Sequence, residues 1–203
     1  MEPWQGGVME AADKFLRANC TNYINSNKSA LKVVENIKQA GIGWFQLIDH
    51  VTFRTHNVEK KAKKIADFGY SHIETLEFKN WWGNTYALKG KPLVFIDQAY
   101  EGEKGEGSLI KEWVDEFGDQ YFHHIAIRVE DIEHSVDYFK SKLYIEFSSA
   151  INGEPNDNLR QIFTKPEMQN GKAFSVLELI ERNNGYMGLL PPQADRLMES
   201  TRL

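Results

Sequence analysis

The sequence predicts an α+β fold in which two tandem βαβββ units form a curved mixed sheet around a central cavity, with extra helices at the N-terminus. A repeat is the first observation behind this prediction. Residues 48–70 and 122–144 align without a gap at an offset of 74 residues, and each segment runs from a strand-like stretch into an amphipathic helix. Three more strand-like stretches follow each helix, which indicates one structural unit used twice.

Alternating apolar residues and turn signals locate the elements of each unit. The polar residues Asn57 and Asp131 precede the two helices and are natural N-caps, since their side chains can accept hydrogen bonds from free backbone N–H groups. The expected strands are residues 47–55, 70–79, 84–89 and 92–98 in the first unit, and 121–129, 145–150, 159–164 and 173–181 in the second.

The whole chain is expected to form a single structural domain. Its expected parts are an N-terminal helical extension (1–45), the first βαβββ unit (46–98), a connecting loop with a short helix (99–119), the second βαβββ unit (120–185) and a C-terminal tail helix (186–203).

Composition excludes several classes of protein. Hydrophobic residues make up 41% and charged residues 26% of the 203 residues, as is ordinary for a globular chain. The net charge of −5 and the absence of a basic stripe argue against nucleic acid as a partner. No apolar run reaches the roughly 18 residues that span a bilayer, and the acidic N-terminus lacks the apolar core of a signal peptide, so no membrane association and a cytoplasmic location are expected.

Cys20 is the only cysteine, so the chain can form neither an internal disulfide nor a thiolate cluster for zinc. Any metal site must therefore use His, Asp and Glu. His50 and His124 fall on the same position of the repeat, each on the face of a strand that it shares with residues two and four positions further on. The remaining histidines are expected to be structural; they are His56, His72, His123 and His134.

Glu178 lies in the middle of the almost wholly apolar stretch FSVLELIER. An unpaired buried carboxylate is costly, and a metal ion would remove that cost. Two histidines and one carboxylate are the ligands of non-haem Fe(II) oxygenases. Glu178 could equally be a hydrogen-bonded core acid or face the solvent.

These residues resemble the vicinal oxygen chelate superfamily, which includes glyoxalases, bleomycin-resistance proteins and dioxygenases. The runs HHIAIRVEDI, LRQIFTKP and LELIERN are similar to the catalytic domain of 4-hydroxyphenylpyruvate dioxygenase, and IDHVTFRT is similar to the start of 2-oxoadipate dioxygenases. The resemblance covers roughly residues 45–200. It implies a central metal cavity with His50, His124 and Glu178 as ligands and Fe(II) as the cofactor, with Zn, Ni, Mn and Co as other divalent candidates.

The same resemblance implies roles for further residues. Gln161, in LRQIFTKP, matches a glutamine that lines the active site near the substrate. Arg54 matches an arginine that engages a substrate carboxylate, although it could instead form a salt bridge at the cavity rim. Trp82 and Tyr186 are candidates for the pocket lining, an alternative to the core role that aromatic residues more often have.

The activity implied is that of an Fe(II)-dependent dioxygenase that decarboxylates and hydroxylates a 2-oxo acid. The expected partners are this small-molecule substrate and O2, and a homodimer is considered because members of the superfamily often form dimers. The tail NNGYMGLLPPQ lacks the Gly-Asn-Phe stretch of the 4-hydroxyphenylpyruvate enzymes, so a different 2-oxo acid fits better.

Two other functions are weighed against this one. A metal-dependent isomerase, lyase or epimerase of the glyoxalase type would need a fourth protein ligand, for which Asp97 is the candidate. A non-catalytic binding protein of the bleomycin-resistance type would keep the fold without the ligands. Retention of His50, His124 and Glu178 argues against this last class.

Overall fold

The structure is a computed structural model that describes residues 3–202. The chain divides into two compact units. The first unit comprises the chain up to Tyr23 and His50–His123; the second comprises Ile24–Asp49 and the chain from His124 onward. Each unit combines helices with parallel and antiparallel strand pairs, so the α+β class predicted from the sequence is confirmed.

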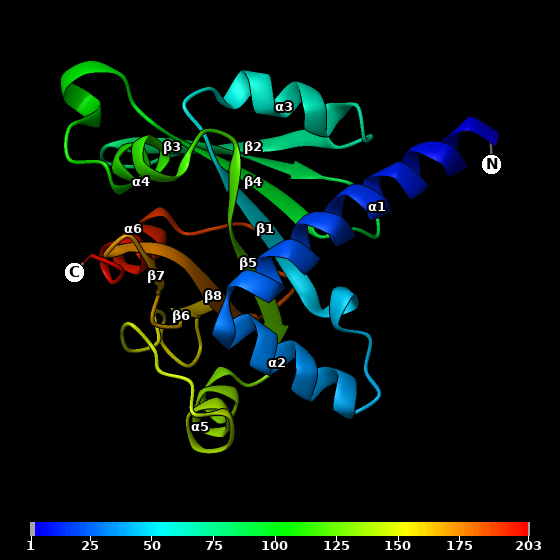
Figure 1. Cartoon of the computed structure of the whole chain (residues 1–203), viewed down its shortest axis with the longest axis vertical. Helices are drawn as coiled ribbons and strands as arrows, with labels where there is room; N and C mark the ends of the chain where they lie inside the picture. The colour runs from blue at the N-terminus through cyan, green and yellow to red at the C-terminus, as the bar shows by residue number, and fades with distance from the viewer. Residues whose placement is uncertain (1–2, 203) are drawn as a thin grey trace. The chain divides into compact units, whose positions relative to one another are not determined.

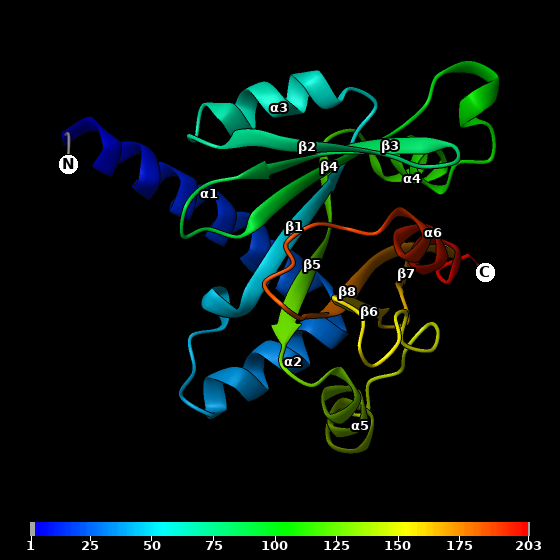
Figure 2. The ribbon, with the colours of Figure 1, turned by 180° about the vertical axis from the view of Figure 1, so that it is seen from behind.

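The first unit orders its strands β2-β3-β4-β1 (Figure 2). Their bounds are Ile48–Arg54 for β1, Ser71–Glu77 for β2, Trp81–Ala87 for β3 and Leu93–Ala99 for β4. The β2–β3 and β3–β4 pairs are antiparallel, whereas β4 runs parallel to β1. The first and last strands of the unit are therefore neighbours that point the same way.

The helices that accompany these strands are α1 (Pro3–Ser26), α3 (Val58–Ala66) and α4 (Leu109–Phe117), with the 3-10 turn η2 (Gly102–Gly105) (Figure 1). The Asn57 side chain accepts a 2.8 Å hydrogen bond from the backbone N–H of Lys60, so the predicted cap of α3 is confirmed. Cys20 lies fully buried on α1, and burial raises the pKa of its thiol to about 12.

The second unit repeats the arrangement with strands in the order β5-β8-β6, and β7 pairs with β8 outside that path. The bounds are Tyr121–Val129 for β5, Leu159–Phe163 for β6, Glu167–Gln169 for β7 and Lys172–Arg182 for β8. Here too the first and last strands, β5 and β8, are parallel neighbours. Its helices are α2 (Lys28–Gln39), α5 (Ile132–Leu143) and α6 (Pro191–Glu199), with a 3-10 turn, η1 (Trp44–Leu47).

The predicted strand at residues 145–150 is wrong. The segment makes only an isolated bridge between Phe147 and Thr164, and the third strand of the unit is instead the short β7. The hydroxyl and the backbone N–H of Ser148 both donate to the Phe163 carbonyl of β6, so this segment meets β6 through isolated contacts instead of a regular ladder. Gly153 follows with φ +103°, a left-handed conformation that favours glycine and breaks an extended run.

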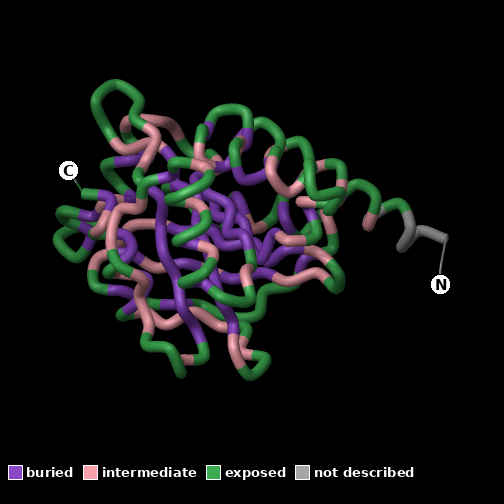
Figure 3. Tube along the Cα trace, turned by 90° about the horizontal axis from the view of Figure 1, so that it is seen from below, coloured by how far each residue is buried: buried purple, intermediate pink, exposed green. Residues whose placement is uncertain are grey.

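Burial follows the strands. β1 is buried along its whole length, and β6 and most of β8 are buried as well, so these strands form the interior of their units. Figure 3 marks the buried, intermediate and exposed stretches along the Cα trace. β2 differs, because all but one of its residues are exposed. None of the helices within residues 3–202 has the length and hydrophobicity that a membrane crossing requires.

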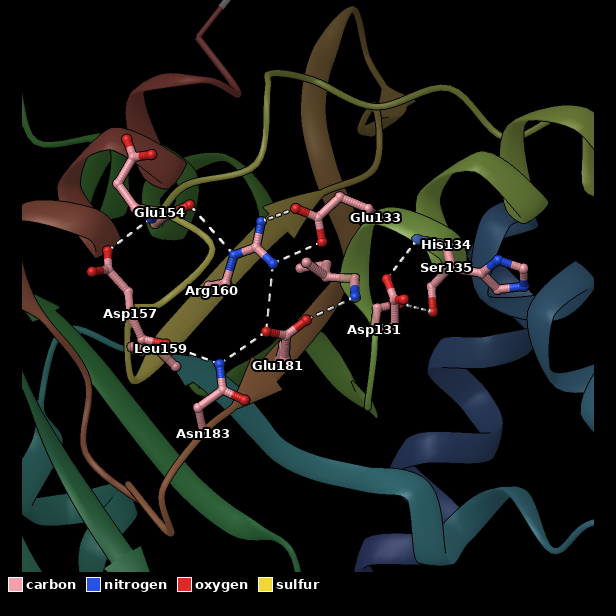
Figure 4. A network of polar contacts seen from close by, with 12 residues as sticks. Asp131, Glu133, His134, Ser135, Glu154, Asp157, Leu159, Arg160, Glu181 and Asn183 are labelled. Carbon is pink, nitrogen blue, oxygen red and sulfur yellow. Dashed lines mark hydrogen bonds and ion pairs between the residues drawn. The ribbon is translucent and has the colours of Figure 1, made fainter.

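A buried polar network joins helix α5 to β6 and β8 (Figure 4). Glu181 accepts hydrogen bonds from the backbone N–H of Ile132, at 2.8 Å, and from the Asn183 side chain, at 2.9 Å. Arg160 forms an ion pair with Glu181 at 3.5 Å and two hydrogen bonds with Glu133. Glu181 is 5% exposed and anchors the first turn of α5.

We expect Glu181→Ala to lower the free energy of unfolding by about 3 kcal/mol, because it leaves Arg160 and the Ile132 N–H without a buried partner. Urea denaturation followed by circular dichroism measures the change. Glu133→Ala is the matched control: its side chain is 51% exposed, so its loss is expected to cost less than about 1 kcal/mol. Equal losses for the two variants would contradict the role given to Glu181.

Candidate metal centre

His124 and Glu178 meet in the second unit. β5 and β8 pair in register with Ala126 opposite Glu178, and His124 shares the strand face of Ala126. The His124 Nε2 and Glu178 Oε2 atoms lie 3.2 Å apart, and both side chains are buried. An imidazole nitrogen and a carboxylate oxygen are thus held together away from solvent.

His50 occupies the equivalent position in the first unit. It lies on β1 opposite Leu93 of β4 and is 2% exposed. Its ring packs edge-on against the ring of Phe95, with the ring centroids 4.8 Å apart. Val51 and Phe53 point to the opposite face of the strand, so strand alternation places the imidazole on the face of Thr52 and Arg54.

His50, His124 and Glu178 form a group that could hold a metal ion: one ligand atom from each lies within 4.8 Å of the others. The donors are two imidazole nitrogens and one carboxylate oxygen. This set suits Fe(II), and it also suits Zn(II) and other divalent first-row metals. The chemistry of the three residues therefore fits the metal that the sequence implies.

The two units differ at the position equivalent to Glu178. In the second unit Ala126 pairs with Glu178, and in the first unit the aligned residue Thr52 pairs with Phe95. An apolar ring therefore stands in the first unit where the second has its carboxylate. Asp97, the candidate for a fourth ligand, lies two residues further along β4, in register with Arg54.

Arg54 is buried in the first unit, 3% exposed. Its guanidinium carbon lies 5.3 Å from the centroid of the Trp113 ring on α4, and Trp113 in turn packs edge-on against His123. Burial lowers the pKa of Arg54 to about 9, and the Asp97 carboxylate opposes this shift, so the guanidinium remains charged at neutral pH. Sequence reasoning missed Trp113, although its place on the apolar face of α4 beside Ile110 and Val114 was a usable signal.

Gln161 lies on the same strand face as Glu178 in the second unit, because it pairs with Ile180 and cross-strand neighbours share a face. Its side chain donates a 3.2 Å hydrogen bond to Gln193 of α6. Gln193 donates in turn to the carbonyl of Leu159. Gln193 was not predicted as a site residue, since nothing in the sequence indicates which strand a C-terminal helix covers.

Tyr186 packs with Leu189 and Leu190 against a small apolar cluster of β5, β6 and β8. The members of that cluster are Ala126, Leu159 and Ile180. The Tyr186 hydroxyl donates a 3.2 Å hydrogen bond to the Leu189 carbonyl, which closes the loop on itself. Tyr186 thus lies over the strand face that carries Glu178.

Trp82 lies on the opposite face of the first unit's strands from Phe95 and Asp97. Thr85 pairs with Phe95 and Gly83 pairs with Asp97, so odd-numbered residues of β3 share the face of those two residues. Strand alternation turns Trp82 away from that face. The structure therefore does not bring Trp82 to the side of the sheet where His50 lies.

Several solved structures share this fold. A protein from Shewanella frigidimarina NCIMB 400, provisionally assigned as a hydrolase, matches with a TM-score of 0.72 at 18% identity over 89% of this chain and 98% of its own. A provisionally assigned glyoxalase superfamily protein from Ralstonia eutropha JMP134 matches with a TM-score of 0.68 at 12% identity, over 91% of this chain and 86% of its own.

Two enzymes of known reaction are also similar. A variant of 4-hydroxymandelate synthase from Streptomyces coelicolor matches with a TM-score of 0.59 at 17% identity, over 76% of this chain. This chain spans about half of that enzyme, 54% of its length. A methylmalonyl-CoA epimerase bound to methylmalonyl-CoA matches with a TM-score of 0.52 at 16% identity, over 68% of this chain and 94% of its own.

No protein-family model and no curated protein matches the sequence. The structural likenesses, all at low identity, show that this chain shares the fold of these proteins, one of which is described as a glyoxalase superfamily protein. The same fold therefore serves enzymes of different chemistry, and the distinction among them must come from the residues of the site.

We expect His124→Gln to weaken divalent metal binding by more than about 100-fold, since it removes one of three donors. Isothermal titration of the metal-free protein with Co(II) measures the dissociation constant. His134→Gln is the control, because His134 is exposed and lies outside the donor group. If neither substitution changes the metal affinity, the three side chains do not form a metal site.

Proposed function

We propose that this chain is an Fe(II)-dependent dioxygenase that acts on a 2-oxo acid. The observation that carries the proposal is the donor set of His50, His124 and Glu178 combined with Phe95 at the position equivalent to Glu178. Three protein ligands leave coordination positions open for a substrate and for dioxygen. An isomerase or epimerase of the glyoxalase type would need a fourth ligand, and Phe95 cannot provide one.

The overall reaction consumes one 2-oxo acid and one dioxygen. The bond between the carboxylate carbon and the keto carbon breaks, and carbon dioxide leaves. One atom of dioxygen enters the new carboxylate and the other becomes a hydroxyl group on the substrate. Fe(II), when bound, would supply Lewis acidity toward the oxygen atoms of the substrate and transient electron transfer to dioxygen, while the 2-oxo acid itself is the net source of electrons.

The residues of the chain hold and orient the substrate. Arg54 binds a substrate carboxylate, for which its charge and its planar set of donors are suited. Gln161 presents an amide to the substrate, and the bond to Gln193 keeps that amide from rotating freely. Tyr186 and the neighbouring leucines exclude water from the strand face that carries Glu178.

Oxygen consumption by the Fe(II)-loaded protein tests the proposal. The protein is loaded under anaerobic conditions and mixed with a panel of 2-oxo acids in an oxygen electrode, and ¹⁸O2 is used to follow both atoms into the product. Oxygen uptake with matching release of carbon dioxide is expected for at least one substrate. Failure of every 2-oxo acid to cause uptake by protein with confirmed bound iron would refute the proposal.

We expect Phe95→Glu to tighten Zn(II) binding by about tenfold or more and to abolish oxygen uptake, because it adds a carboxylate at the position equivalent to Glu178. Competition titration with a chromophoric chelator measures the affinity. Phe95→Gln is the matched control, with the same length and no charge. If the glutamate variant keeps both the original affinity and oxygen uptake, the register argument for three ligands is wrong.

We expect Arg54→Lys to raise the KM of the substrate by about 10- to 100-fold, because lysine keeps the charge but loses the bidentate donors. Steady-state oxygen uptake separates this effect from a change in kcat. Arg128→Lys is the control, since Arg128 is the aligned arginine of the second repeat and is exposed. Equal KM values for the two variants would argue for a structural role of Arg54.

A further inference from the structure

A buried ion pair in the second unit joins the residue before His50 to the strand that carries Glu178. Arg182 Nε donates to one oxygen of Asp49 at 2.8 Å, and Nη2 donates to the other oxygen at 2.9 Å. The side chains are 0% and 2% exposed. A bidentate pair of this kind sets direction as well as distance, because two parallel bonds fix the plane of the guanidinium.

The same arginine also holds the loop that follows β8. Its third donor, Nη1, bonds to the carbonyl of Gly188 at 2.7 Å. Gly188 directly precedes Leu189, which packs with Tyr186 against the apolar cluster of β5, β6 and β8. One guanidinium therefore fixes the start of β1, the end of β8 and the loop that leads to α6.

The position of the pair along the chain links it to the proposed ligands. Asp49 is joined to His50 by a single peptide bond, and consecutive Cα atoms are about 3.8 Å apart. Arg182 lies four residues after Glu178 and on the same face of β8. A shift of Asp49 relative to β8 would carry His50 with it.

We propose that Asp49 and Arg182 are positioning residues that hold His50 at the distance from Glu178 that one metal ion requires. The proposal rests on the metal site put forward above. A buried ion pair is weak support for stability, since its desolvation cost offsets much of its attraction. Its fixed geometry is the property that an apolar pair could not supply.

A second buried arginine provides a matched comparison. Arg160 is 5% exposed and lies on β6, next to β8, where it also makes a two-bond contact with a carboxylate, that of Glu133. It pairs in register with Glu181, so it lies on the opposite face from Glu178. Arg160→Lys therefore disturbs another two-bond contact of a buried arginine, on the face of β6 and β8 that does not carry the ligand.

The first measurement is metal affinity. Arg182→Lys is expected to raise the dissociation constant for Co(II) by about 10- to 100-fold, as outer interactions around metal ligands commonly do, and to shift the visible absorption of bound Co(II). Arg160→Lys is expected to lower the Tm but to change the dissociation constant by less than about twofold. Equal effects of the two variants on affinity would overturn the proposal.

The second measurement needs no metal. Hydrogen exchange of the metal-free protein is expected to be at least about tenfold faster in peptides that cover residues 48–54 when Arg182 is lysine, and in peptides that cover 132–143 when Arg160 is lysine. Unchanged exchange in 48–54 for Arg182→Lys would overturn the positioning role. This result would stand even if the wild-type chain bound no metal, which would refute the proposed function instead.

A double variant separates positioning from stability. Asp49→Leu with Arg182→Met replaces the buried pair with apolar side chains, a change that often preserves stability. The expected result is a Tm within a few degrees of the wild type together with a Co(II) affinity about tenfold weaker or worse. A double variant that folds and binds Co(II) with wild-type affinity would show that the pair has no positioning role.

Discussion

The parallel pairing of the first and last strands of each unit is the constraint on which the rest of the structure depends. β1 with β4, and β5 with β8, each form a parallel pair whose register decides which side chains share a face. The shared register gives Glu178 and Phe95 equivalent places in the two units. A slip of one residue in either pair would turn every side chain of that strand to the other face.

Much of the fold could be predicted because its signals are local. Short stretches of sequence are enough to reveal the repeat and the helix caps at Asn57 and Asp131. They also show that His50 and His124 occupy equivalent positions of the repeat. The strand expected at residues 145–150 failed because serine and glycine contacts that depend on β6 replace the regular ladder there. The pattern of residues within 145–150 does not indicate contacts with a strand that comes later in the chain.

The parts of the candidate site that sequence reasoning missed depend on pairings between distant segments. Phe95 has no motif, and its equivalence to Glu178 appears only once both strand registers are known. Trp113 and Gln193 lie on helices whose packing partners are far away in the chain. The two buried arginines of the second unit likewise look alike in sequence, yet Arg182 lies on the face of Glu178 and Arg160 on the face of α5.

The buried thiol of Cys20 has a consequence for how the chain withstands oxidants. Peroxide oxidises cysteine as the thiolate. With a pKa near 12 and no exposed surface, the single cysteine of this chain remains a protonated, inaccessible thiol at neutral pH. Oxidative damage would then fall on exposed methionines such as Met168 and Met187, whose sulfoxides form at the surface and leave the core intact.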